Sequence, residues 1–335
     1  MAEWGRIHGA PISRALGFTR ERTPCAATFY HLFRRLDRAA LEACLGAWTC
    51  QVLAALPSEV PPVREGVAMD GKTLRGSRKQ GAPLTHLLSA VSHRLGLTLG
   101  QVAVPDKTNE ITAIHPLLAG LVLAGYVVTL DALLTQEKIA QALVAAHAHY
   151  LMIVKKNQPA LLDALVTAFA DPALLAEHPY SQAQTTDRGH GRRTVRTLTL
   201  SSALAGYLTW PGQQQVVQLV RTTTKLRTGV VTQEIVYGLT SLSPTQADAA
   251  ALLTRIRAHW TIENRSHWVR DVTYDEDRSQ VRVGAIPQVM TAFRNTAIAL
   301  LRLHGEPNLA AACRRLAAHP WQALALLHLP APTIK

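Results

Sequence analysis

Cysteine is scarce in this 335-residue chain, and its positions exclude the usual cysteine-based sites. Cys25, Cys44, Cys50 and Cys313 form no Cys-x-x-Cys pair, and none has histidines at zinc-finger spacing. We therefore expect neither a disulfide framework nor a structural zinc site. A reducing cytoplasm fits this pattern best.

Long apolar runs, leader-like segments and glycine-rich phosphate loops are also missing. The longest run, LLAGLVLAGYVVTL at 117–130, contains glycines and stops at Asp131, short of the roughly 20 residues that cross a bilayer. The start, MAEWGRIHG, has no apolar segment typical of a signal peptide. We therefore expect no membrane partner and no secretion.

Acidic residues are few beside the basic ones. Thirty-five Lys and Arg stand against 23 Asp and Glu, a formal net charge of +12. Such a field attracts polyanions, with nucleic acid favoured over an anionic membrane. The 48% of hydrophobic residues supply a core, so a folded protein with a polyanionic partner is indicated.

Hydrophobic spacing divides the chain into regions. Residues 27–56 have helical spacing, and the proline-rich linker PSEVPPVREG at 57–66 follows. Residues 64–156 then predict the order β-β-β-α-β-α-β, with the first strand ending at Asp70 and parallel pairing in the second half. We expect an N-terminal helical region over 1–60 and a second domain over 61–335.

The second half of the chain combines a basic β-rich stretch with helices. Residues 182–240 are rich in Thr, Val and Gln and predict a β-rich insertion, within which 188–227 hold seven Lys and Arg and no acid. Ser243 and Pro244 predict the start of a long helix over about 244–270. Two or three further helices are expected between Pro287 and Leu327.

Three carboxylates stand out as candidate catalytic groups. Asp70 and Asp131 end predicted strands, where a parallel sheet opens its ligand crevice. The alternative roles are a turn for Asp70 and an N-cap for Asp131. Glu263 shares a partly apolar helix face, which should pack inward, with Ile256, Trp260, His267 and Asp271. We expect Trp260 to anchor this helix against the sheet. A carboxylate on such a face needs a cation or a metal ion as partner.

The histidines around Glu263 also suggest a zinc-binding helix. Metalloproteases place two histidines four residues apart with the Glu next to the first. Here His259 and His267 are eight residues apart with Glu263 between them, so zinc is disfavoured. Three carboxylates in a basic protein suit two-metal phosphoryl transfer better.

Five blocks of the sequence carry a resemblance to a known family. They are MDGKTLRGSR at 69–78, VVTLDALLTQEKIA at 127–140, YLMIVKKNQPALL at 150–162, HGRRTVR at 190–196 and IRAHWTIENRSHWVRDVTYDEDRSQVRVG at 256–284. In this order they resemble the DDE transposases of bacterial insertion sequences, specifically the ISAs-type branch with its DGK-x-x-RGS and HW-x-IEN motifs.

The resemblance implies an α/β protein with an RNase H-like mixed sheet flanked by helices. It implies that Asp70, Asp131 and Glu263 hold two Mg²⁺ ions, for which Mn²⁺ can substitute. Such enzymes use water to nick the transposon end and a DNA 3′-hydroxyl to attack the target. The implied partners are double-stranded DNA, as terminal inverted repeats and target, and a second copy of the chain on DNA. The implied location is the bacterial nucleoid.

The resemblance and the local charge also indicate DNA-binding side chains around the carboxylates and on the insertion. They are Lys72, Arg75, Arg78, Lys155, Lys156, Asn157, His190, Arg192, Arg193, Arg196, Asn264 and His267. Asp271 is expected to support the metal site or to pair with an arginine.

The chain also departs from the family pattern. Thr194 stands where related enzymes commonly have an acid, and Ile256, His259 and Arg270 stand where some branches have Tyr, Arg and Lys. Relatives usually begin with a further helical segment, so the chain is expected to be truncated at its N-terminus. An inactive or recruited DNA-binding derivative and a stand-alone Mg²⁺ nuclease therefore remain alternatives to a transposase.

Overall fold

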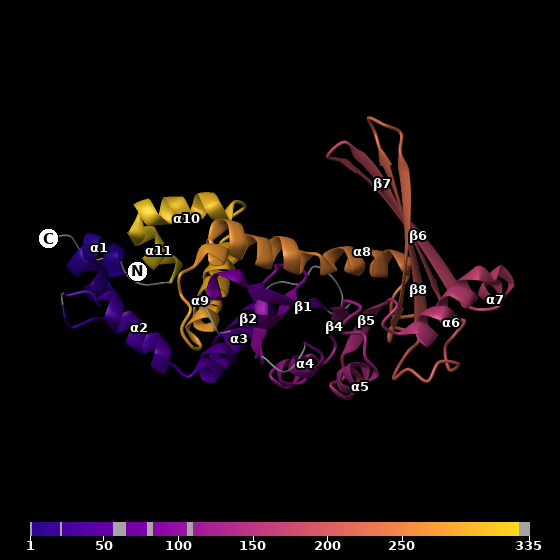
Figure 1. Ribbon diagram of the computed structural model, residues 1–335, viewed down its shortest axis with the longest axis horizontal. Helices are drawn as coiled ribbons and strands as arrows, with labels where there is room; N and C mark the ends of the chain where they lie inside the picture. The colour runs from indigo at the N-terminus through magenta and orange to yellow at the C-terminus, as the bar shows by residue number, and fades with distance from the viewer. Residues whose placement is uncertain (1, 21, 56–64, 79–82, 106–109, 328–335) are drawn as a thin grey trace.

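The computed structural model describes residues 2–20, 22–55, 65–78, 83–105 and 110–327. Within them, one sheet of nine strands runs through the molecule in the order β3-β2-β1-β4-β5-β9-β8-β7-β6. Helices cover both faces of its first half, and the last strands project beyond them (Figure 1). Most of the linker expected at 57–66 lies outside the described residues.

Strands β1 to β5 form the first half of the sheet. Strand β1 (Gly66–Leu74) pairs antiparallel with β2 (Thr85–Ser92), which pairs antiparallel with β3 (Thr98–Val104). Strands β4 (Val127–Leu130) and β5 (His149–Val154) are then added in parallel. The order β-β-β-α-β-α-β expected from the sequence is confirmed, and with it the RNase H-like mixed sheet.

Alternation along β1 separates a packed face from the face that carries the acids. Val67 and Met69 belong to the main core, while Ala68 packs with Ile262 on the opposite face. Because side chains alternate along a strand, Asp70 and Lys72 share the face of Ala68. The main core also takes in α4 (Glu110–Ala119), α5 (Glu137–Ala145) and α6 (Pro159–Ala170).

Strands β6 to β9 form a long antiparallel ribbon, which confirms the β-rich nature of the insertion. They span Tyr180–Gly189, Arg192–Ser201, Gln215–Lys225 and Val231–Thr240. The short α7 (Pro172–Ala176) precedes them. Strand β9 pairs antiparallel with β5, so the ribbon continues the sheet instead of forming a separate one.

The segment that carries Glu263 crosses the open face of the sheet. It consists of α8 (Ala249–His259) and two π-helical stretches, Ile262–His267 and Val269–Thr273. Helix α8 packs on Val127, Leu151 and Val217 of the sheet. Figure 1 shows α8 on the side of the sheet opposite α4 and α5.

The remaining helices lie at the end of the molecule away from the ribbon (Figure 1). They are α1 (Ala2–Ala15), α2 (Ala26–Arg35), α3 (Arg38–Ala55), α9 (Ile286–Leu303), α10 (Leu309–Ala318) and α11 (Pro320–Leu326). Short 3₁₀ turns occupy Arg75–Ser77 and Glu276–Arg278. None of the described helices has both the length and the apolarity that a membrane crossing requires.

Two sequence expectations about element ends are wrong. Strand β1 does not end at Asp70 but continues to Leu74, because Gly71 to Leu74 keep pairing with β2. The long helix does not start at Ser243: Asp248 is the N-cap of α8, and its side chain accepts a hydrogen bond from the Ala251 amide.

Candidate active site

Asp70 and Asp131 lie on neighbouring strands of the sheet. The parallel register pairs Met69 of β1 with Leu130 of β4, and the next residue on each chain is an aspartate. Asp131 is also tied to the backbone, because its Oδ1 accepts a hydrogen bond from the Leu134 amide at 3.1 Å. The two aspartates are therefore held side by side, and the N-cap alternative for Asp131 fails because α5 begins at Glu137.

The π-helical stretch brings Glu263 over the same part of the sheet. The Trp268 amide donates to the Glu263 carbonyl, a five-residue spacing that defines the wider π turn. This change of pitch alters which side chains face inward: Ile262, Ser266 and Arg270 are buried, whereas Trp260 is 56% exposed. Trp260 is the C-cap of α8, before the π-helical stretch, and its exposure shows that the expectation that it anchors the helix against the sheet is wrong.

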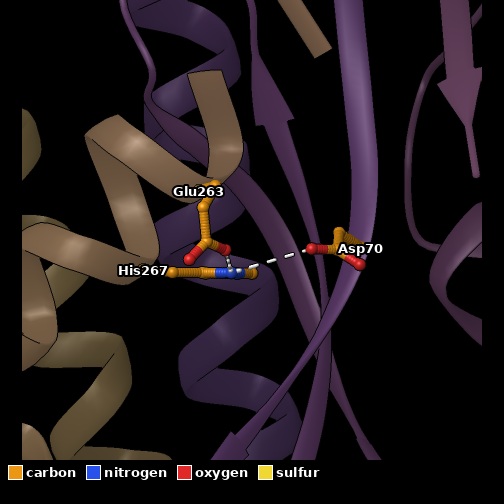
Figure 2. A group of neighbouring side chains, drawn as sticks. All are labelled: Asp70, Glu263 and His267. Carbon is orange, nitrogen blue, oxygen red and sulfur yellow. Dashed lines mark hydrogen bonds and ion pairs between the residues drawn. The ribbon is translucent and has the colours of Figure 1, made fainter. Parts of the chain in front are cut away.

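His267 points directly at the carboxylates. Figure 2 shows its ring beneath Glu263 and facing Asp70. His267 Nδ1 lies 3.2 Å from Glu263 Oε2 and 3.8 Å from Asp70 Oδ2. One potential ligand atom from each of the three residues lies within 4.8 Å of the others. Two carboxylates and an imidazole at this spacing are a donor set that fits a divalent cation.

Burial and neighbouring charge shift the ionisation of all three groups. Burial, with the charges of Glu110, Asp131 and Glu263, raises the pKa of Asp70 to about 7. Burial lowers the pKa of His267 to about 4, helped by the charges of Arg270 and Lys72. The hydrogen bond with His267 lowers the pKa of Glu263. Near neutral pH the site therefore holds an ionised Glu263, a neutral His267 and an Asp70 close to its midpoint.

A cavity of about 340 Å³ opens beside these groups. Asp70, Asp131 and Glu263 all line it, although Asp131 is not within the tight group around His267. Apolar walls come from β5, β8 and β9, and Lys155 lies at its edge. Three acids from two strands and one helix thus converge on a single opening.

A chain of buried hydrogen bonds lies behind Asp131. His259 Nδ1 is 2.9 Å from Thr129 Oγ1, and His93 Nε2 is 3.0 Å from the same hydroxyl. Burial lowers the pKa of His259 and lowers that of His93 to about 3. His259 lines the cavity. Sequence reasoning missed these hydrogen bonds: His93 lies in a strand pattern, and Thr129 stands in the block at 127–140, where only Asp131 was chosen as a candidate.

Lys72 is committed to an ion pair with Asp271. Its Nζ lies 2.5 Å from Asp271 Oδ2, and the lysine side chain is 10% exposed. Asp271 was expected to support the metal site or to pair with an arginine, and its partner is instead this lysine. The neighbouring Arg270 is fully buried and pairs with Glu276 at 3.5 Å.

Several of the expected DNA-binding residues are exposed around the cavity. Lys155 and Lys156 follow β5, which lies beside the strand of Asp131 as expected. Arg75, Arg78, Asn157 and Asn264 are exposed as well. Arg75 is within 3.9 Å of Asp277, and the Asn157 amide donates to the Ala132 carbonyl. Asn157 thus braces the loop after Asp131. His267, in contrast, is buried away from any surface that DNA could reach directly.

The candidates on the ribbon lie at two places along β7. His190, Arg192 and Arg193 are exposed at the β6–β7 turn. Arg196 instead forms an ion pair with Asp187, which also accepts from Arg257 of α8 at 3.0 Å. Arg196 therefore links the ribbon to α8 and shares the single Asp187 carboxylate with Arg257.

The same region of the chain matches a known family model. Residues 61–300 match the model described as the transposase DDE domain. The chain belongs to the transposase DDE-domain family. Asp70, Asp131 and Glu263 all lie within the matched residues.

Relatives of this DDE-domain protein carry transposase names. "Putative transposase YncI" of Escherichia coli O157:H7 is 31% identical over 287 residues, covering 83% of this chain and 71% of the relative. "H repeat-associated putative transposase YhhI" of Escherichia coli strain K12 is 30% identical, covering 71% of this chain and 64% of the relative. Among solved structures, the piggyBac transposase in a synaptic complex with hairpin DNA is a distant likeness, with a TM-score of 0.44 and 10% identity, covering 81% of this chain and 55% of that one.

Proposed function

We propose that this protein is a transposase that cuts and rejoins DNA at the ends of an insertion sequence of the ISAs-type branch. The observation that carries the proposal is the convergence of Asp70, Asp131 and Glu263 on one cavity in a chain of net charge +12. Family membership and the transposase-named relatives support it. The partners are the terminal inverted repeats, the target DNA and, on DNA, a second copy of the chain.

The three acids are proposed to hold two Mg²⁺ ions, for which Mn²⁺ can substitute. Their oxygens are the hard ligands that Mg²⁺ prefers, and the close charges that displace the pKa of Asp70 are those a cation would neutralise. Bound metal ions activate the attacking oxygen and stabilise the leaving one. Asp70 and Asp131 are fixed by strand pairing, so the ligands are preorganised.

Other residues position the DNA and the catalytic glutamate. His267 orients Glu263 through its 3.2 Å contact. Lys155 and Lys156 supply exposed cations at the cavity edge for the DNA backbone. Arg192 and Arg193 extend this positive surface along the ribbon. The N-terminal helical region, residues 1–60, would serve end binding or dimerisation.

Strand cleavage tests the proposal. The protein is incubated with Mg²⁺ and a labelled duplex of the terminal repeat that flanks its own reading frame, and nicked and joined products are separated. We expect wild type to nick and join, and Glu263→Gln to lose at least about 100-fold in rate because it removes a ligand charge. Glu137→Gln is the matched control, since Glu137 is exposed on α5.

The other outcomes separate the alternatives. Nicking without joining would identify a stand-alone nuclease, and DNA binding without nicking would identify a recruited DNA-binding derivative. Equal cleavage by Glu263→Gln and wild type would refute the role assigned to Glu263.

A further inference from the structure

We propose that His267 is itself a metal ligand, so that Asp70, Glu263 and His267 form a mixed oxygen and nitrogen site for one of the two cations. This inference rests on the proposed function. It adds that the site favours cations which accept nitrogen, such as Mn²⁺, over Mg²⁺ and Ca²⁺.

The spacing of the three ligand atoms suits one ion. Atoms bound about 2.1 Å from an octahedral cation lie roughly 3 to 4.2 Å apart, depending on whether they are adjacent or opposite. His267 Nδ1 lies 3.2 Å from Glu263 Oε2 and 3.8 Å from Asp70 Oδ2. Both distances fall within that range, and Figure 2 shows the nitrogen between the two carboxylates.

The orientation of His267 leaves one ring nitrogen for a ligand. Its side chain is 4% exposed, and Nε2 is buried without a hydrogen-bond partner in the described parts of the chain. Nδ1 is therefore the ring atom that a cation can reach. The spacing of four residues along the helical segment places this buried ring beside the half-exposed Glu263.

In the part of the chain that the structure describes, the two carboxylates have no Lys or Arg in direct contact. Among these residues, Asp70 and Glu263 form ionic contacts with His267, and the charges of Lys72 and Arg270 act on Glu263 without an ion pair. Lys72 lies on the same face of β1 but pairs with Asp271, and Arg270 pairs with Glu276. Two carboxylates this close are stable together only with a cation or a bound proton.

The nitrogen ligand makes this position different from the one at Asp131. Mg²⁺ and Ca²⁺ prefer oxygen ligands, whereas affinity for imidazole increases from Mn²⁺ towards Co²⁺ and later divalent metals. Asp131 is outside the group that includes His267 and is tied to the Leu134 amide. The two cation positions therefore differ in their preference for metals.

Pulsed electron paramagnetic resonance of the full chain loaded with Mn²⁺ alone tests this directly. We expect wild type to show hyperfine coupling from a directly bound imidazole nitrogen. Protein labelled with ¹⁵N-histidine must show a changed coupling. This test needs neither a variant nor a cleavage assay. His267→Asn places an amide oxygen near the position of Nδ1, so it should abolish the coupling while Mg²⁺ still binds.

A competition titration measures the preference. His267→Asn should lower the ratio of Mn²⁺ to Mg²⁺ affinity by roughly 10-fold or more, in the range found when groups around a metal are altered. His115→Asn is the matched control, because His115 is exposed on α4 and lies outside the group of three. Its coupling and metal preference should match wild type.

The failures are distinguishable. If wild type binds Mn²⁺ and nicks DNA but shows no histidine coupling, the role of His267 as a ligand is overturned and the proposed function stands. Coupling that persists in folded His267→Asn would overturn it as well. If wild type binds no divalent cation and nicks no DNA, the proposed function itself fails, and this inference fails with it.

Discussion

Asp70 is held in a position where its charge is unfavourable without a cation. It is buried beside three other acids, and its pKa is raised from 3.8 to about 7. The unfolded chain releases this proton near pH 4, whereas the folded chain retains it up to about pH 7. The contribution of Asp70 to stability is therefore fully present below pH 4 and is lost as the pH rises through 7.

Asp70→Asn should therefore stabilise the metal-free protein in alkaline solution. The neutral amide avoids the buried charge, so at about pH 8 we expect a gain of about 1–2 kcal/mol, after allowing for the 32% exposure of the side chain. At about pH 4 the variant and wild type should unfold at similar temperatures. Thermal unfolding in a chelator at both values measures the difference.

The matched control is Asp163→Asn, because Asp163 is exposed on α6. It should change the unfolding temperature little at either pH. If Asp70→Asn unfolds at a lower temperature than wild type at the higher pH, burial and the neighbouring acids do not destabilise the ionised Asp70 carboxylate. Added Mg²⁺ should stabilise wild type more than Asp70→Asn.

At the scale of elements, the strands and the early helices follow from the sequence, whereas the ends and pitch of the long helix do not. Alternation and β-branched residues predicted β1 to β5 correctly. Ser243 and Pro244 looked like a helix start, but Asp248 supplies the cap. Spacings of three and four residues assume an α-helix, so they predict the inward position of His267 but cannot reveal the π turn over Ile262–His267 or the exposure of Trp260 just before it.

The acids of the site could be predicted from the sequence, but not all of their contacts. Asp70, Asp131 and Glu263 could be chosen because they stand out in motifs, and the structure brings all three to one cavity. The inward position of His267 follows from its spacing of four residues from Glu263, but the pairing of Lys72 with Asp271 could not be chosen. That pairing depends on how a helix packs on a strand almost 200 residues away in the chain.

The true start of α8 gives a test at this scale. Asp248→Ala should lower the free energy of unfolding by about 1 kcal/mol, because the Ala251 amide loses its side-chain acceptor. Ser243→Ala is the control and should have a smaller effect, since Ser243 lies outside the helix. Urea denaturation measures both. If Ser243→Ala lowers the free energy of unfolding more than Asp248→Ala does, the helix begins at Ser243, as the sequence suggested.

At the scale of the whole molecule, the ribbon projects from one end and a group of helices lies at the other (Figure 1). Strands β8 and β9 of the ribbon line part of the cavity. Exposed cations at the β6–β7 turn extend the positive surface well beyond the acids. In the proposed function, this surface follows the DNA backbone while the acids act on one phosphate. Binding through several phosphates makes affinity depend on salt.

Removing two of these cations should weaken DNA binding in a recognisable way. For Arg192→Ala/Arg193→Ala, we expect lower affinity for all sequences and a salt dependence whose logarithmic slope falls by about 2. Fluorescence anisotropy at several salt concentrations measures the slope. The control is Arg314→Ala/Arg315→Ala on α10, at the opposite end of the molecule. If the salt dependence of the ribbon variant has the same slope as that of wild type, Arg192 and Arg193 do not contact the DNA backbone.

The continuity of the sheet has a mechanical consequence. Because β9 pairs with β5, and β5 with β4, hydrogen-bonded strands join the ribbon to the residue after β4, Asp131. The Arg196 and Arg257 contacts with Asp187 connect the ribbon to α8 as well. In the proposed function, DNA held on the ribbon would therefore be positioned relative to Asp131 through the sheet itself.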